Sequence, residues 1–128
     1  KAAGAKRALP LPVSAPFHCS LMQPAADAMA QALATATIDA PSLPVVANVL
    51  ATSYADPSQT ADLLVRQVTG RVRWRESVEW MAGQGVTELV ELGAGAVLGG
   101  LTKRIVSDVT AQSVGTADGL KGFAESLR

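Results

Sequence analysis

The sequence predicts a parallel α/β fold, and three observations support that prediction. Short apolar segments alternate with segments whose apolar residues recur every three or four positions, which is the order strand, helix, strand. The expected strands are apolar on both faces, as in a parallel sheet covered by helices on both sides. The chain has 128 residues, of which 48% are hydrophobic, and can bury a core. Its strands are few for a doubly wound sheet, so it looks like the C-terminal part of one.

The N-terminal region is expected to hold the end of one element and a first complete helix. Residues 1–4 look like the end of a helix closed by a glycine, and residues 6–13 like a strand. Two prolines make that strand an edge strand or an extended linker. A helix is predicted over residues 21–35, where Pro24 fits the first turn. Its apolar positions at helical spacing are Met22, Met29 and Leu33.

The middle of the chain predicts a strand and then a helix. Residues 45–50 are mostly β-branched and indicate a buried strand that one amide side chain interrupts. The next helix has a recognisable start, because Asp56 can cap it and Pro57 suits the first position. Gln59 is placed to reach back to the cap, as in a capping box. This helix is expected to end at Gly70.

The last third of the chain predicts a helix, a strand, a helix, a strand and a helix. Their expected positions are residues 74–83, 87–92, 97–105, 110–114 and 119–127. The faces expected to be buried are Trp74, Val78 and Met81 in the first of these helices and Val97, Leu101 and Ile105 in the second. The strand, G-x-G, helix order at Gly93–Gly95 is similar to a dinucleotide-binding turn, but Leu98 occupies the third glycine position, so the fingerprint fails.

Composition excludes several classes of function. Eleven basic residues balance eleven acidic ones, so nothing favours binding to nucleic acid or to a membrane surface. No apolar run reaches the roughly 18 residues that span a bilayer. A single cysteine, Cys19, cannot form an internal disulfide, and a cytoplasmic location is expected. The sequence does not begin with methionine, so we expect it to lie inside a larger protein.

His18 is the only histidine and lies between an extended segment and a helix. A lone histidine in a turn is more often a partly buried residue than a catalytic one. Imidazole is nevertheless the side chain best suited to proton transfer near pH 7, provided that a nucleophile and an orienting group are present. Composition and spacing alone leave both interpretations open.

Residues 14–22, Ser-Ala-Pro-Phe-His-Cys-Ser-Leu-Met, closely resemble the catalytic-histidine segment of the malonyl-CoA:acyl carrier protein transacylase family. The resemblance continues, in the family's order, through residues 44–49, 64–68, 72–74 and 91–105. It covers nearly the whole chain and favours the functional interpretation of the histidine.

The resemblance implies an α/β-hydrolase-like large domain with an inserted ferredoxin-like small subdomain. Residues 1–13 would be the last strand of the small subdomain, and residues 14–128 the C-terminal part of the large domain. It also implies transfer of malonyl from coenzyme A to the phosphopantetheine thiol of acyl carrier protein, in fatty-acid biosynthesis, through a serine acyl-enzyme and ping-pong kinetics. No metal or cofactor is implied, because malonyl-CoA is a substrate.

The resemblance also assigns roles to particular residues. His18 would be the general base, and Gln67, forty-nine residues later, would orient it through a neutral carbonyl acceptor. Phe17 would narrow the space beside C2 of the substrate, although core packing is the plain alternative. Asn48 is a candidate for substrate contact, and structural support is the favoured alternative because a buried amide needs partners.

The family's serine motif, G-H-S-x-G, is absent from this sequence. The N-terminal part of the same enzyme, which would carry that serine, is therefore an expected partner, together with acyl carrier protein. Two other interpretations of the function stay open: the acyltransferase domain of a polyketide synthase, and a non-catalytic α/β binding module that uses the turn at Gly93–Gly95.

Overall fold

The computed structural model describes residues 2–10 and 12–128, and Lys1 and Leu11 lie outside the described residues. A 3-10 turn, Ser20–Met22, leads into α1 (Gln23–Leu33), and a second one, Pro57–Gln59, leads into α2 (Thr60–Thr69). Between them lie the short strands β1 (Val46–Ala47) and β2 (Thr52–Ser53). The C-terminal half contains α3 (Trp74–Gly83), β3 (Glu88–Leu92), α4 (Val97–Ile105), β4 (Thr110–Val114) and α5 (Ala117–Ser126).

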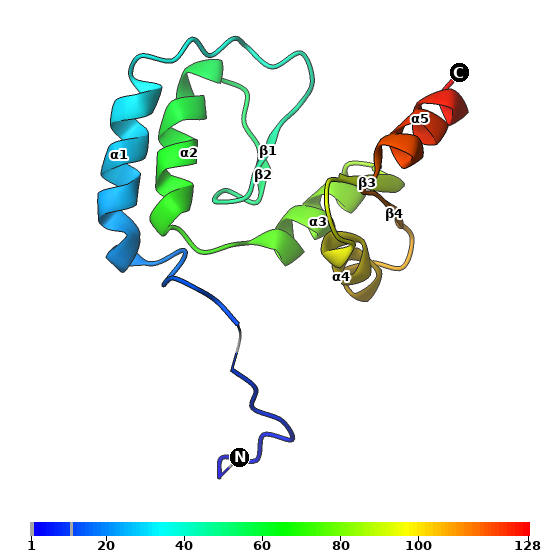
Figure 1. The fold of residues 1–128 in the computed structure, drawn as a ribbon, viewed down its shortest axis with the longest axis horizontal. Helices are drawn as coiled ribbons and strands as arrows, with labels where there is room; N and C mark the ends of the chain where they lie inside the picture. The colour runs from blue at the N-terminus through cyan, green and yellow to red at the C-terminus, as the bar shows by residue number, and fades with distance from the viewer. Residues whose placement is uncertain (1, 11) are drawn as a thin grey trace.

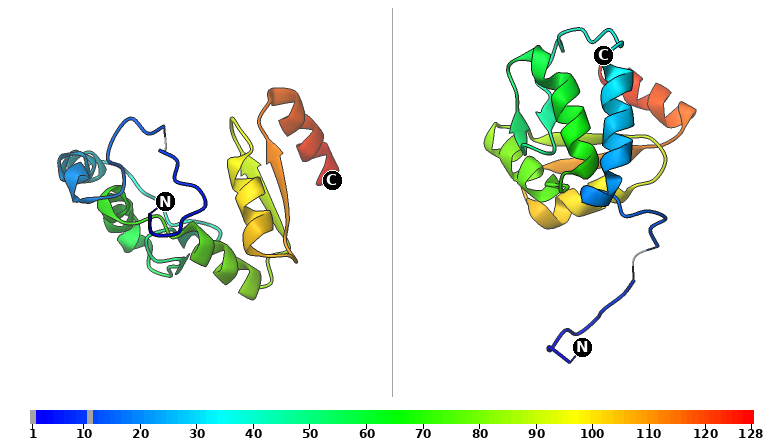
Figure 2. Two further views of the ribbon diagram at one scale, coloured as in Figure 1. Left: turned by 90° about the horizontal axis from the view of Figure 1, so that it is seen from below. Right: turned by 90° about the vertical axis from the view of Figure 1, so that its left-hand side faces the viewer.

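The elements form two neighbouring groups that α3 joins. Helices α1 and α2 lie side by side, with the β1–β2 hairpin beside α2 (Figure 1). On the other side of α3, Figure 2 shows β3 and β4 running together with α4 packed along them and α5 after β4. The N-terminal segment extends away from the α1–α2 pair (Figure 1).

The predicted parallel α/β arrangement is confirmed in the C-terminal half. Strands β3 and β4 pair in parallel, from Glu88 opposite Thr110 to Leu92 opposite Val114. Helix α4 connects them, as a parallel pair requires. The predicted helices at residues 74–83 and 97–105 match α3 and α4, and α2 ends before Gly70 as expected.

The prediction of a buried strand over residues 45–50 is wrong. Only Val46–Ala47 forms a strand, and it pairs with Thr52–Ser53 in antiparallel fashion. The chain turns after Ala47, because the N–H groups of Leu50 and Ala51 both donate to the carbonyl of Ala47. Ala51 completes the turn with a left-handed φ of 58°. Local hydrogen bonding thus replaces the extended ladder that the β-branched residues suggested.

The helix end and the strand that are predicted at the N-terminus are also absent from the residues that the structure describes there. Residues 2–4 form a turn in which Gly4 has a φ of 87°, and no helix precedes it among them. No strand forms over residues 6–10 or 12–13, although the prediction extends across Leu11, which lies outside the described residues. Pro10 and Pro12 lack the N–H groups that a ladder uses, which is the physical reason.

The buried face of α4 differs from the predicted one. Val97 and Leu101 are 67% and 38% exposed, whereas Gly99 and Thr102 are buried. A Cβ on Gly99 would lie 3.3 Å from the Ser113 hydroxyl, so the absence of a side chain lets the helix approach β4 closely. The Thr102 hydroxyl is satisfied although buried, because it donates to the carbonyl of Leu98 at 3.0 Å.

Glu91, in β3, caps the beginning of α4. Its carboxylate accepts the backbone N–H groups of Val97, Leu98 and Gly99 at 3.1–3.2 Å, and the hydroxyl of Ser113 at 2.9 Å. These N–H groups have no partner within the helix and lie at the positive end of its dipole. The bonds from Gly99 and Leu98 are the main reason that the pKa of Glu91 lies below its usual value.

We predict that Glu91→Gln raises the hydrogen-exchange rates of the Val97, Leu98 and Gly99 amides by roughly fivefold at neutral pH, the weight of one helix cap. A group with a lowered pKa in the fold contributes stability above its unfolded pKa and loses it as pH falls through the folded pKa. The difference from wild type should therefore shrink below the usual carboxyl range. Glu88→Gln is the matched control, because Glu88 accepts from the Gln112 side chain and leaves the cap intact. Equal protection in wild type and Glu91→Gln at neutral pH would show that the carboxylate does not stabilise α4.

Candidate active site

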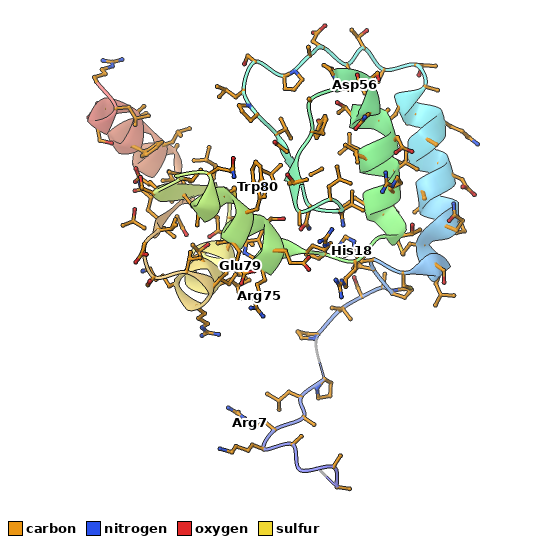
Figure 3. The ribbon with its side chains drawn as sticks, turned by 180° about the vertical axis from the view of Figure 1, so that it is seen from behind. Arg7, His18, Asp56, Arg75, Glu79 and Trp80 are labelled. Carbon is orange, nitrogen blue, oxygen red and sulfur yellow. The ribbon has the colours of Figure 1, made fainter. Side chains whose placement is uncertain are left out.

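His18 lies at the junction between the N-terminal segment and the α1–α2 pair (Figure 3). Its backbone has a left-handed φ of 59°, a conformation in which histidine is enriched among non-glycine residues. Just before it, Phe17 donates its N–H to the carbonyl of Ala15 in a tight turn. Just after it, Cys19 is extended and begins the 3-10 turn that leads into α1. The turn and the helix start thus fix His18 on a sharp bend, with its ring at the surface.

The ring is oriented by a residue far away in sequence. Nδ1 of His18 lies 2.9 Å from the main-chain carbonyl oxygen of Gln67. A carbonyl only accepts hydrogen bonds, so Nδ1 carries the proton, and Nε2 of the neutral ring is an unprotonated base. The arrangement brings together the two residues that the family resemblance pairs, with the main chain of Gln67 as the contacting group.

The position of Gln67 in α2 explains why its carbonyl is free. The helix ends at Thr69, and the last four carbonyls of a helix have no partner within it. The carbonyl of Arg66 is used by the N–H of Gly70, and that of Gln67 remains for His18. The C-terminal end of α2 also carries the negative end of the helix dipole, which favours a positive charge on a nearby imidazolium.

The side chain of Gln67 has a different task from its carbonyl. Its Nε2 donates to the carbonyl of Gly70 at 3.2 Å, just beyond the helix. Its Oε1 is buried and has no hydrogen-bond partner among the described residues. The amide therefore stabilises the end of α2 and does not contact the His18 ring through its oxygen.

Residues 70–73, which connect α2 to α3, are held at both ends. A Cβ on Gly70 would lie 2.7 Å from the Arg66 carbonyl and 3.1 Å from Cγ2 of Val49, so the close approach of the hairpin requires glycine here. At the other end, Oδ1 of Asn48 accepts the N–H of Arg73 at 2.9 Å. The sequence shows Asn48 as a polar residue that interrupts an apolar segment, but it does not show that Asn48 bonds to the start of α3.

Phe17 and Asn48 have different surroundings, although both were candidates for substrate contact. Phe17 is 55% exposed, so core packing does not account for it within the described structure. Asn48 is half-buried, and its oxygen is engaged with α3. The geometry leaves Phe17 available at the surface beside His18 and favours structural support for Asn48.

An open groove of about 460 Å³ borders the start of α3 and is lined mainly by charged residues. Glu76 pairs with the Arg73 guanidinium, which is the main cause of a pKa below its usual value. Arg75 pairs with Glu79 at 2.8 Å, and this bond raises the pKa of Arg75 (Figure 3). These arginines are already paired within the chain.

Two further kinds of site receive no support from the structure. Across residues 2–10 and 12–128, no three histidine, cysteine or carboxylate side chains gather closely enough to hold a metal ion. In the same residues, no helix combines the length and the apolar character needed to cross a membrane.

Comparisons with known proteins give consistent results for sequence and structure. No protein-family model matches the chain. It is 56% identical over 114 residues to proteins named malonyl CoA-acyl carrier protein transacylase from Salmonella typhimurium and Escherichia coli, covering 89% of the chain. It also matches the crystal structure of an acyl-carrier-protein-S-malonyltransferase from Bartonella henselae, with a TM-score of 0.87, 52% identity and 98% of the chain covered.

A further structural neighbour is a malonyl-transacylase solved in complex with a type II PKS acyl-carrier protein, with a TM-score of 0.86 and 47% identity. The chain spans 37% of the length of the Salmonella and Escherichia relatives, and 40% of each of these two structural neighbours. The match to the neighbours extends over 98% of the chain, so the similarity is not confined to the histidine segment. The chain is therefore a homologue of the C-terminal part of malonyl-CoA:acyl carrier protein transacylases.

Proposed function

We propose that this chain supplies the acid–base half of the active site of a malonyl-CoA:acyl carrier protein transacylase. The contact between Nδ1 of His18 and the Gln67 carbonyl carries the proposal, because it fixes the tautomer in which Nε2 can accept a proton. The homology of the chain to transacylases over 89% of its length supports the choice of reaction.

The proposed reaction needs a serine that this sequence does not contribute. As the serine oxygen attacks the thioester carbonyl of malonyl-CoA, Nε2 of His18 takes the serine proton. The carbon–sulfur bond breaks, and the imidazolium returns the proton to the sulfur of coenzyme A. In the second half-reaction, the carrier's phosphopantetheine thiol gives its proton to Nε2 and attacks the acyl-serine. The malonyl group moves to that sulfur, and the serine recovers its proton.

A helix-end carbonyl takes the place that a carboxylate holds in many serine enzymes. A neutral carbonyl stabilises the imidazolium less than a buried carboxylate would, and it introduces no charge that could repel malonate or an acidic carrier protein. The dipole of α2 adds a partial negative charge in the same direction. Fixed orientation of the ring is thus the main contribution that we assign to Gln67.

The proposal includes the wider expectations from the resemblance. The serine-bearing N-terminal part, malonyl-CoA and acyl carrier protein would be the partners, and fatty-acid biosynthesis in the cytoplasm the setting. Residues 14–128 would belong to an α/β-hydrolase-like large domain and residues 1–13 to a ferredoxin-like subdomain. No cofactor takes part in the proposed chemistry.

One observation favours polyketide synthesis as a second candidate. A structural neighbour was solved with a type II PKS acyl-carrier protein, so that transacylase, which has this fold, binds such a carrier. The third reading, a non-catalytic module that binds a ligand at Gly93–Gly95, is disfavoured. The carboxylate of Glu91 already occupies the N–H groups of α4 that would hold an anion there.

The central test compares this chain alone with the chain combined with the serine-bearing part. We expect no covalent label from radiolabelled malonyl-CoA on the chain alone, because a histidine without its nucleophile forms no acyl-enzyme. With the serine-bearing part present, label should appear on a serine and then pass to acyl carrier protein. Fatty-acid and polyketide carrier proteins, tested in parallel, separate the two candidate pathways. Stable label on the isolated chain would contradict the assignment.

Another prediction ranks the two residues that form the candidate site. In the assembled enzyme, His18→Ala should lower the acylation rate by about 10²–10⁴, the usual weight of general base catalysis. Gln67→Ala should lower it less, because the main-chain carbonyl that accepts from His18 remains. Gln31→Ala, in the exposed part of α1, is the control. The measurement is single-turnover kinetics. A larger loss of activity in the Gln67 variant than in the His18 variant would show that the two roles are assigned the wrong way round.

A separate prediction concerns Phe17 and the choice of acyl group. Phe17→Ser should raise methylmalonyl transfer relative to malonyl transfer, because a smaller side chain leaves more room beside C2. One methyl group in a pocket changes discrimination by roughly 10–200-fold. Leu120→Ser, at a similarly exposed apolar position on α5, is the control. An unchanged ratio of the two kcat/KM values would leave Phe17 without a role in selectivity.

A further inference from the structure

Asn48 connects the β1–β2 hairpin to the beginning of α3. Its Oδ1 accepts the main-chain N–H of Arg73 at 2.9 Å and lies 3.5 Å from the hydroxyl of Ser77. Ser77 is 2% exposed, so this contact lies at the inner face of the helix. Asparagine is well suited to such a cap, because its amide oxygen accepts from an N–H group that has no partner in the helix.

Arg73 connects the same two elements in the opposite direction. Its Nη1 donates to the carbonyl of Leu50 at 2.9 Å, and its guanidinium pairs with Glu76. The turn that follows β1 is therefore bonded to Arg73 through both the side chain and the main chain of that residue. Two bonds of different geometry fix where residues 70–73 end.

The beginning of this connection is fixed against the same turn. Gly70 packs on Val49, and its carbonyl accepts from the side chain of Gln67. Gln67 is the residue whose main-chain carbonyl accepts from His18. The turn at residues 48–51 thus contacts both ends of residues 70–73, the segment that connects α2 to α3.

We propose that Asn48 is a positioning residue for His18. By holding Arg73, it keeps residues 70–73 in the course that lets the last turn of α2 present the Gln67 carbonyl to Nδ1. This inference rests on the proposed function, and it assigns Asn48 a role in orienting the base in place of contact with the substrate.

The proposal separates the effect of Asn48 on turnover from an effect on substrate binding. Loss of the acceptor leaves the Arg73 N–H without its partner, and the segment after α2 can shift. The imidazole then spends less time in the orientation that serves the reaction. Small displacements of catalytic groups change rates by about 10–100-fold, whereas the affinity for malonyl-CoA should not change.

The experiment uses the assembled enzyme with three variants. Asn48→Ala should lower kcat by about 10–100-fold with KM for malonyl-CoA within about twofold of wild type. Asn48→Asp keeps an acceptor for the Arg73 N–H and should restore most of kcat. Tyr54→Phe is the matched control, because it removes a hydrogen bond from the hairpin to Thr60 and leaves the Asn48 contact in place. It should have the kcat of wild type.

A spectroscopic readout tests the orientation of His18 without activity. In ¹⁵N-histidine-labelled protein, the His18 Nδ1 proton should give a slowly exchanging signal in wild type, Asn48→Asp and Tyr54→Phe. The signal should be lost or broadened in Asn48→Ala. If Asn48→Ala does not fold, Asn48→Ser takes its place, with a smaller expected effect because its shorter side chain still carries an acceptor oxygen.

The outcomes distinguish failure of this inference from failure of the proposed function. Wild-type kcat and an unchanged Nδ1 signal in Asn48→Ala would overturn the positioning role. A raised KM that Asn48→Asp worsens would assign Asn48 to the substrate, because an added carboxylate would repel malonate. A wild-type enzyme that transfers no malonyl would refute the proposed function, and the Nδ1 signals would still decide whether Asn48 orients His18.

Discussion

The hydrogen bond from His18 to the Gln67 carbonyl depends on where one helix ends. Had α2 continued for another turn, the N–H of residue 71 would compete for that carbonyl, as in any α-helix. Gly70 is extended, with a ψ of 145°, and lies close to Val49, so the helix stops and the carbonyl stays free. The tautomer of His18, the direction of Nε2 and the proposed chemistry all follow from this termination.

Helix ends in this chain are used for two different purposes. The N–H groups at the start of α4 are occupied by Glu91, and the N–H of Arg73 at the start of α3 by Asn48. These polar side chains stabilise the starts of the two helices, and at α4 the carboxylate occupies three N–H groups that could otherwise bind an anion. The C-terminal end of α2 is different, because its free carbonyl meets a residue that can transfer a proton. The end of α2 thus orients the side chain that we propose as the catalytic base.

The sequence predicted the elements that depend on local pattern, and it missed the features that depend on tertiary contact. Periodicity and glycine positions located α3, α4 and the parallel pair β3–β4. The buried face that the sequence predicted for α4 is wrong, because contact with β4 favours Gly99 and Thr102 over larger apolar residues. The resemblance paired His18 with Gln67, but residue identity cannot show that a main-chain atom makes the contact. Asn48 interrupts an apolar segment of the sequence, and only the fold reveals Arg73 as its partner.

The exposure of the candidate site agrees with the proposal that another part of the enzyme completes it. Phe17 and Leu21 are 55% and 72% exposed on either side of His18, and apolar side chains exposed next to one another are typical of an interaction surface. The same fold recurs with a TM-score of 0.87 in a chain of which it makes up 40%. A serine-bearing part that covered Phe17 and Leu21 would exclude water from Nε2 and bring its hydroxyl to the one ring nitrogen that the α2 carbonyl leaves free. Covering the apolar side chains and completing the catalytic pair would then be the same event, and the contact with Gln67 would already have oriented His18 within this chain.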